Sequence, residues 1–118
     1  MYVKIPHTFD PDNPYELIDL PQDTSAWLKA VYKHLECTTI DVASTILPGI
    51  VLVLDDNGKM TDDWPLKINE FASALYPSDW DPIVGNVILA RRNSSELEPL
   101  TDADLDALAD FYDRTVHF

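Results

Sequence analysis

The sequence predicts an α+β protein, a single domain over residues 1–118 in which a small mixed β-sheet of about four to five strands is packed by three helices. Three observations predict this class. The chain contains apolar runs of strand length, stretches with apolar residues at helical spacing, and prolines and glycines that separate the two kinds of segment. With 118 residues, 46% of them hydrophobic, the chain is long enough to bury a core.

The expected strands differ in how apolar they are. Residues 50–54 and 83–90 are apolar on both faces, which is typical of the inner strands of a sheet. Weaker strands, with alternating apolar and polar residues, are expected at residues 2–5, 15–20 and 38–43. The chain is expected to leave the sheet at residues 91–95.

A hairpin is expected directly after residues 50–54. Asn57-Gly58 is a strong hairpin signal because both positions tolerate a positive φ. We therefore expect a positive φ at Gly58 and a short return strand over residues 59–61. The same segment does not fit a calcium-binding loop, because Lys59, Met60 and Leu66 stand where a ligand, a glycine and a bidentate glutamate are needed.

Three helices follow from the spacing of the apolar residues, and the first and third are expected to cover the sheet. The first spans residues 24–36, with Asp23 or Thr24 as its N-cap. The second is a short helix that begins at the N-cap Asn69 and ends before Pro77. The third follows the N-cap Thr101 and runs to about residue 116. Its apolar residues form one stripe: Leu105, Leu108, Ala109, Tyr112 and Val116.

The formal charge of −13 restricts the partners that the protein can have. Residues 93–118 alone carry seven acidic residues and one basic residue, Arg114. A negative field repels phosphates, so direct binding to nucleic acid or to an anionic membrane surface is not expected. What remains is a basic protein partner, or acidity that serves solubility alone. No segment has the length of a membrane span or the pattern of a signal sequence, so we expect a cytoplasmic protein.

No combination of residues predicts catalysis, a metal site or a cofactor. The only cysteine, Cys37, follows a glutamate that raises a thiol pKa, and the three histidines are far apart in the sequence. Three glycines are too few and too scattered for a phosphate-binding loop. We therefore expect a protein that is not an enzyme and that uses no cofactor.

The third helix carries the clearest functional pattern. Asp102, Asp106, Asp110 and Asp113 follow the spacing i, i+4, i+8, i+11 and fall on one helix face. At a rise of about 1.5 Å per residue, carboxylates four residues apart lie about 6 Å apart, close to the phosphate spacing of one nucleic-acid strand. These four residues are therefore a candidate partner-binding surface, with a nucleic-acid-mimicking inhibitor as one form of the hypothesis. The alternative is a solvated acidic face.

A second candidate belongs to a different class. Trp64 and Trp80 flank the second helix, and indole rings beside acidic residues occur at binding sites. Together with Asn69 they are a candidate cleft for a small ligand that the protein would bind or sequester. The alternative is that the two indoles cover the ends of a small core.

Several motifs resemble one family. They are residues 28–31 ahead of Ile40-Asp41-Val42, the run 49–59 that ends in Asp55-Asp56-Asn57-Gly58-Lys59, Leu66-x-x-Asn69-x-x-Ala72-x-x-Leu75, the run 81–88, and the step Leu100-Thr101. Over residues 27–112 the chain resembles the phage and plasmid family called domain of unknown function 3846. Residues 65–69 depart from the family's tighter Leu-Pro-x-Asn spacing, and Cys37-Thr38 stands where a Gly-Gly-like step is common. The resemblance implies a mobile-element origin and the cytoplasm of a bacterial host. It supplies no activity, but it favours a host-interaction or anti-defence role.

Overall fold

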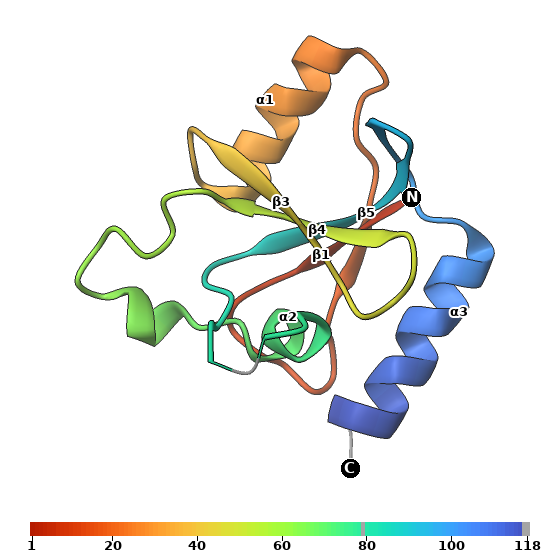
Figure 1. The fold of residues 1–118 in the computed structure, drawn as a ribbon. Helices are drawn as coiled ribbons and strands as arrows, with labels where there is room; N and C mark the ends of the chain where they lie inside the picture. The colour runs from red at the N-terminus through yellow and green to blue at the C-terminus, as the bar shows by residue number, and fades with distance from the viewer. Residues whose placement is uncertain (79, 117–118) are drawn as a thin grey trace.

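The structure, a computed structural model, describes residues 1–78 and 80–116 (Figure 1). Its β-sheet has six strands. They are β1 (Tyr2–Ile5), β2 (Glu16–Ile18), β3 (Ile40–Ser44), β4 (Ile50–Asp55), β5 (Val87–Asn93) and β6 (Glu96–Glu98). The helices are α1 (Thr24–Leu35), α2 (Glu70–Leu75) and α3 (Asp102–Phe111), with a short 3-10 turn at Trp64–Lys67 and a π-helical turn at Tyr112–Val116. The α+β class is confirmed.

The strand order is β2-β1-β5-β4-β3, and β6 pairs with the far end of β5. The central position of β4 and β5 confirms that the two most apolar runs are inner strands. The mixed sheet of about four to five strands was wrong in detail, because all five strand pairings of the described residues are antiparallel and the strands number six. Short connections explain part of this result, since strands joined by a tight turn run in opposite directions.

The two faces of the sheet bury separate clusters of apolar side chains. On one face, Val31 and Leu35 of α1 pack against residues of β1, β4 and β5. On the other face, α2 and α3 contribute Phe71 and Leu108, and the rings of Phe71 and Tyr112 stack with centroids 5.3 Å apart. Figure 1 shows α1 on one side of the sheet and α2 and α3 on the other. The helices after residues 23 and 101 therefore cover the sheet as predicted.

The helix boundaries follow the predicted caps. The Asp23 carboxylate accepts a hydrogen bond from the backbone N–H of Ala26, and Asn69 caps α2 in the same way through Ala72. Thr101 and Asp104 form a capping box at the start of α3. The predicted third helix continues to residue 116 as a π-helical turn. The side chain of Val116, expected in the apolar stripe, lies outside the described part of the chain.

The predicted hairpin at Gly58 is wrong. Among the described residues, positive φ angles occur at Gly49 and Gly85 but not at Gly58, and residues 59–61 form no strand. A different turn forms at Asn57. The backbone N–H of Asn57 donates to the Asp55 carboxylate, and its side-chain amide donates to the Thr39 hydroxyl. These bonds turn the chain away from β4 before a return strand can pair.

The segment around β5 also differs from the prediction. The strand begins at Val87, because Gly85 takes a φ of +83° that interrupts the extended run after the buried residues 83 and 84. Residues 91–93 stay in the sheet rather than leaving it, and they pair with β6. Ser94 allows this hairpin by adopting a φ of +57°, which few non-glycine residues do.

Candidate functional site

The exposed face of α3 is the surface that the sequence singled out. Asp102, Asp106, Asp110 and Asp113 are all exposed, whereas Leu108 is fully buried and Tyr112 nearly so. Folding thus uses one side of the helix and leaves the four carboxylates in solvent. Within the described part of the chain, Asp110 is the one of the four that forms an ion pair, with Arg114 at 3.0 Å, which leaves three uncompensated charges.

One acidic residue of α3 has a structural role that the sequence analysis did not identify. Asp104 is 4% exposed and its carboxylate accepts two hydrogen bonds from the Arg91 guanidinium, one of them from Nε at 2.7 Å. The same carboxylate accepts the backbone N–H of Thr101. Arg91, followed by the Thr101 contacts, lowers the pKa of Asp104 to about 2 against the cost of its burial. Asp104 therefore holds α3 on β5 and is not available to a partner.

Trp64, Asn69 and Trp80, the residues of the alternative ligand site, serve different purposes. Asn69 is 1% exposed, and its side-chain amide donates to the carbonyls of Ile5 and Gly85 while its oxygen caps α2. Trp80 is 88% exposed, and Trp64 lies under the ammonium group of Lys59, 5.6 Å from the ring centroid. The two clefts described below include none of these three residues in their lining.

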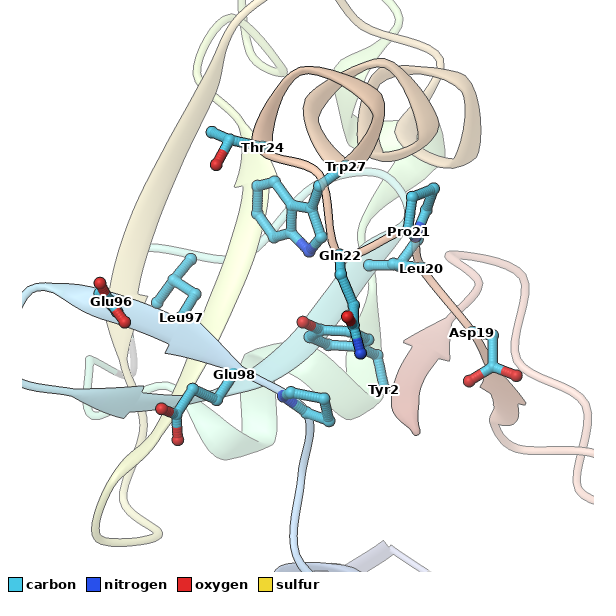
Figure 2. A pocket seen from close by; sticks show the side chains of 11 residues that line it. Tyr2, Asp19, Leu20, Pro21, Gln22, Thr24, Trp27, Glu96, Leu97 and Glu98 are labelled. Carbon is cyan, nitrogen blue, oxygen red and sulfur yellow. The ribbon is translucent and has the colours of Figure 1, made fainter.

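The larger cleft lies between β6 and the segment that leads into α1, and it was not predicted. Its cavity volume is about 600 Å³. Figure 2 shows Trp27 and Tyr2 between the side chains of β6 and those that follow β2. The lining consists of Tyr2, Asp19, Leu20, Pro21, Gln22, Thr24, Trp27, Glu96, Leu97, Glu98 and Pro99. These residues come from three distant parts of the sequence, which the pairing of β1 with β2 and of β5 with β6 brings together. Sequence reasoning missed this cleft because it did not identify β6.

A smaller cleft, with a cavity volume of about 190 Å³, lies at the end of β4. Lys59 and Asp81, two of its lining residues, form an ion pair with each other. The charges that face this cleft are therefore partly neutralised within the protein.

The described residues contain neither a metal-binding cluster nor a membrane-spanning helix. In those residues no three His, Cys, Asp or Glu side chains converge as metal ligands do. Within the same part of the chain, none of the helices combines the length and the apolar character that crossing a bilayer requires.

Comparison with known proteins identifies the family. The chain matches the family described as a domain of unknown function (DUF3846) over residues 7–113, which is nearly its whole length. The protein therefore belongs to this family, as the sequence motifs indicated. No curated protein and no solved structure matches the chain.

Proposed function

We propose that this protein is a non-enzymatic interaction protein that binds a basic protein partner through the exposed acidic face of α3. The observation that carries the proposal is that α3 has two different faces, one packed on the sheet and one acidic and exposed. Leu108, Tyr112 and the Arg91–Asp104 pair attach α3 to the sheet, while four further aspartates lie exposed on it. Each pair of like charges at i, i+4 destabilises a helix by a few tenths of a kcal/mol. Helix stability therefore does not explain these four aspartates, whereas binding to a basic partner does.

The proposed partner carries a basic surface of the kind that binds nucleic acid. Carboxylates at a spacing of about 6 Å along a helix can occupy positions that phosphates would take in a basic groove. In a family of phage and plasmid type, such a protein would act in the bacterial cytoplasm as an inhibitor of a host defence or replication protein. The negative charge also raises the rate of association with a basic partner.

The test compares two variants with the same net charge. In the first, Asp102, Asp106, Asp110 and Asp113 are replaced by Asn. In the second, four exposed acids on other parts of the chain are replaced by the matching amides: Glu36, Asp41, Asp56 and Asp62. Each protein is immobilised and used to capture proteins from bacterial lysate at low salt, and the association rate of every captured protein is then measured at several salt concentrations.

We expect the α3 variant to associate at least about tenfold more slowly than the parent, with a shallower salt dependence. At 0.1 M salt the second variant should associate at a rate within about twofold of the parent's, because exposed charges farther away than a Debye length of about 10 Å are screened. Equal rates for the two variants would show that net charge, and not the α3 face, governs binding.

A further inference from the structure

The cleft between β6 and residues 19–24 has walls of two kinds. Three carboxylates line it, those of Asp19, Glu96 and Glu98, and the lining contains no lysine or arginine. Leu97 packs on the side of the sheet that holds the rings of Trp27 and Tyr2, which meet edge-to-face with centroids 6.5 Å apart, whereas Glu96 and Glu98 face the other side. Carboxylates attract arginine and lysine side chains, and the aromatic wall accepts apolar ones, so the cleft is complementary to a segment with basic residues on one side and apolar residues on the other.

The charge of Glu98 acts on the Tyr2 hydroxyl in the cleft and on Arg91, its partner across the hairpin. Burial raises the pKa of the Tyr2 hydroxyl above its usual value of 10.0, the neighbouring Trp27 opposes this rise, and the charge of Glu98 adds to it. Glu98 already accepts a hydrogen bond from Asn93 at 3.1 Å, which holds its side chain in place. This hydrogen bond orients the Glu98 carboxylate at the border of the cleft.

One wall of the cleft is a strand edge. In the β5–β6 hairpin the Asn93–Glu96 pair closes a two-residue turn, so the next pair, Arg92–Leu97, is the non-hydrogen-bonded kind. The backbone N–H and C=O of Leu97 consequently point away from β5. Among the described residues β6 pairs with β5 alone, and its other edge faces the cleft. An unpaired edge of this kind can accept a further strand.

We infer that this cleft binds an extended basic segment of a partner protein, which pairs with the free edge of β6. Glu96 and Glu98 face one side of the sheet and Leu97 the other, because side chains alternate along a strand. The complementary segment therefore alternates basic and apolar residues, with the basic ones beside the two glutamates. A volume of about 600 Å³ is in the range of ligand-binding clefts, which is about 300–1,000 Å³. The cleft is separate from the exposed face of α3, so this inference does not depend on the proposed function.

The experiment uses the peptide acetyl-Arg-Val-Arg-Val-Arg-amide as the probe. Trp64 and Trp80 are replaced by Phe, so that Trp27 is the remaining indole and its emission reports binding in the cleft. One variant of this protein carries Asp19→Asn, Glu96→Gln and Glu98→Gln. The matched control carries Asp10→Asn, Asp12→Asn and Asp62→Asn, three exposed acids outside the cleft that give the same net charge. Circular dichroism checks that each protein is folded.

We expect the peptide to shift the Trp27 emission of the parent and of the matched control with similar affinity. Binding to the cleft variant should be at least about tenfold weaker, because the lost carboxylates are partly desolvated in the complex. Two peptides that are N-methylated at alternate residues test the strand pairing, and one of them should bind at least about tenfold more weakly than the other.

Three results would overturn the inference. The first is an unchanged Trp27 emission with the parent protein at any peptide concentration. The second is equal affinity for the cleft variant and its matched control. The third is agmatine, a small guanidinium compound, binding as tightly as the peptide, since the cleft would then be a site for a small cation and not for an extended segment.

Discussion

The contact between Arg91 and Asp104 joins the sheet to α3. Arg91 donates through two nitrogens to a carboxylate that is almost fully buried, and Asp104 also completes the capping box with Thr101. Such a bidentate pair fixes both the position and the rotation of the helix. The contact therefore helps to determine which face of α3 packs on the sheet and which stays exposed.

Replacing Asp104 by Ala should therefore lower the free energy of unfolding by about 2–4 kcal/mol, because the change leaves Arg91 without its carboxylate and α3 without half of its cap. Asp106→Ala, an exposed acid on the same helix, should change it by less than about 0.5 kcal/mol. Urea unfolding of both variants measures the difference. A cost for Asp104→Ala no larger than that for Asp106→Ala would contradict the assigned role.

The same pair predicts a pH dependence. The pKa of Asp104 is about 2 in the folded protein against an ordinary value of 3.8, so folding favours the ionised form. Its contribution is present above pH 3.8 and is lost as the pH falls toward 2. We expect Asp104→Asn to be less stable than the parent by about 1–2 kcal/mol near neutrality, with a difference that shrinks across this range. Unfolding curves at a series of pH values test this, and a constant difference would speak against it.

Gly49 is required for a reason that involves the same arginine. Its φ is +79°, and a Cβ at this position would lie 2.5 Å from Nη1 of Arg91. Gly49→Ala should therefore destabilise the protein by about 1–3 kcal/mol, through backbone strain and displacement of Arg91. Gly85→Ala provides the control, because its φ of +83° gives similar strain with open space around the Cβ. A smaller loss for Gly49→Ala than for Gly85→Ala would show that the contact with Arg91 is unimportant.

At the scale of whole elements, α2 is attached to the rest of the fold chiefly through its cap. The Asn69 side chain bonds to α2, to the end of β1 and to the segment before β5, which are far apart in the sequence. A six-residue helix has little intrinsic stability, so these bonds and the burial of Phe71 and Leu75 determine its position.

Asn69→Ala should cost about 2–4 kcal/mol, because two buried carbonyl groups and a helix N-terminus lose their partner. Asn69→Asp keeps the cap acceptor but places a carboxylate oxygen against the carbonyls of Ile5 and Gly85, so it should be no more stable than Asn69→Ala at neutral pH. Chemical denaturation of the two variants measures this, and full retention of stability by Asn69→Asp would contradict it.

The elements with local signals were predictable from the sequence. The caps at Asp23, Asn69 and Thr101 were identified because a cap depends on a few neighbouring residues. Gly58 was misread because its turn is decided by a bond from Asn57 to Thr39, 18 residues away. β6 was missed because Ser94-Ser95 is a weak hairpin signal, although Ser94 adopts a positive φ.

Of the candidate sites, one was likewise predictable from a local signal in the sequence and the other was not. The exposed face of α3 follows from the helical spacing of its aspartates, which is a local property. The role of Asp104 and the cleft beside β6 depend on residues that only the strand register brings together, such as Arg91 opposite Glu98. Strand pairing brings together residues that are far apart in the sequence, so these features could not be predicted from residue spacing alone.

At the scale of the whole molecule, the charge of −13 acts against folding. Carboxylates repel one another across a compact surface, and the ion pairs found, such as Lys4–Glu16 at 3.9 Å, are mostly exposed and weak. Salt screens this repulsion, with a Debye length that falls from about 10 Å at 0.1 M to about 3 Å at 1 M.

The midpoint of thermal unfolding should therefore rise as sodium chloride is added at pH 7. The variant with Asn at residues 102, 106, 110 and 113 should be at least as stable as the parent at low salt and should gain less from added salt. Differential scanning calorimetry measures both midpoints. A midpoint that falls as sodium chloride is added would show that attractive ion pairs outweigh the repulsion.

The order of the strands also affects how the protein is made. Of the six strands, β1 is synthesised before the other five, yet it lies between β2 and β5, and β5 begins only at Val87. The carbonyl of Met1 likewise accepts the N–H of Leu100. During synthesis the nascent chain can form α1 and the β3–β4 hairpin early, but the sheet cannot close until most of the chain has been translated. Until then β5 is not in place between β1 and β4, and the apolar side chains of these two strands are not covered by it. The negative charge of the chain makes such partly folded molecules repel one another.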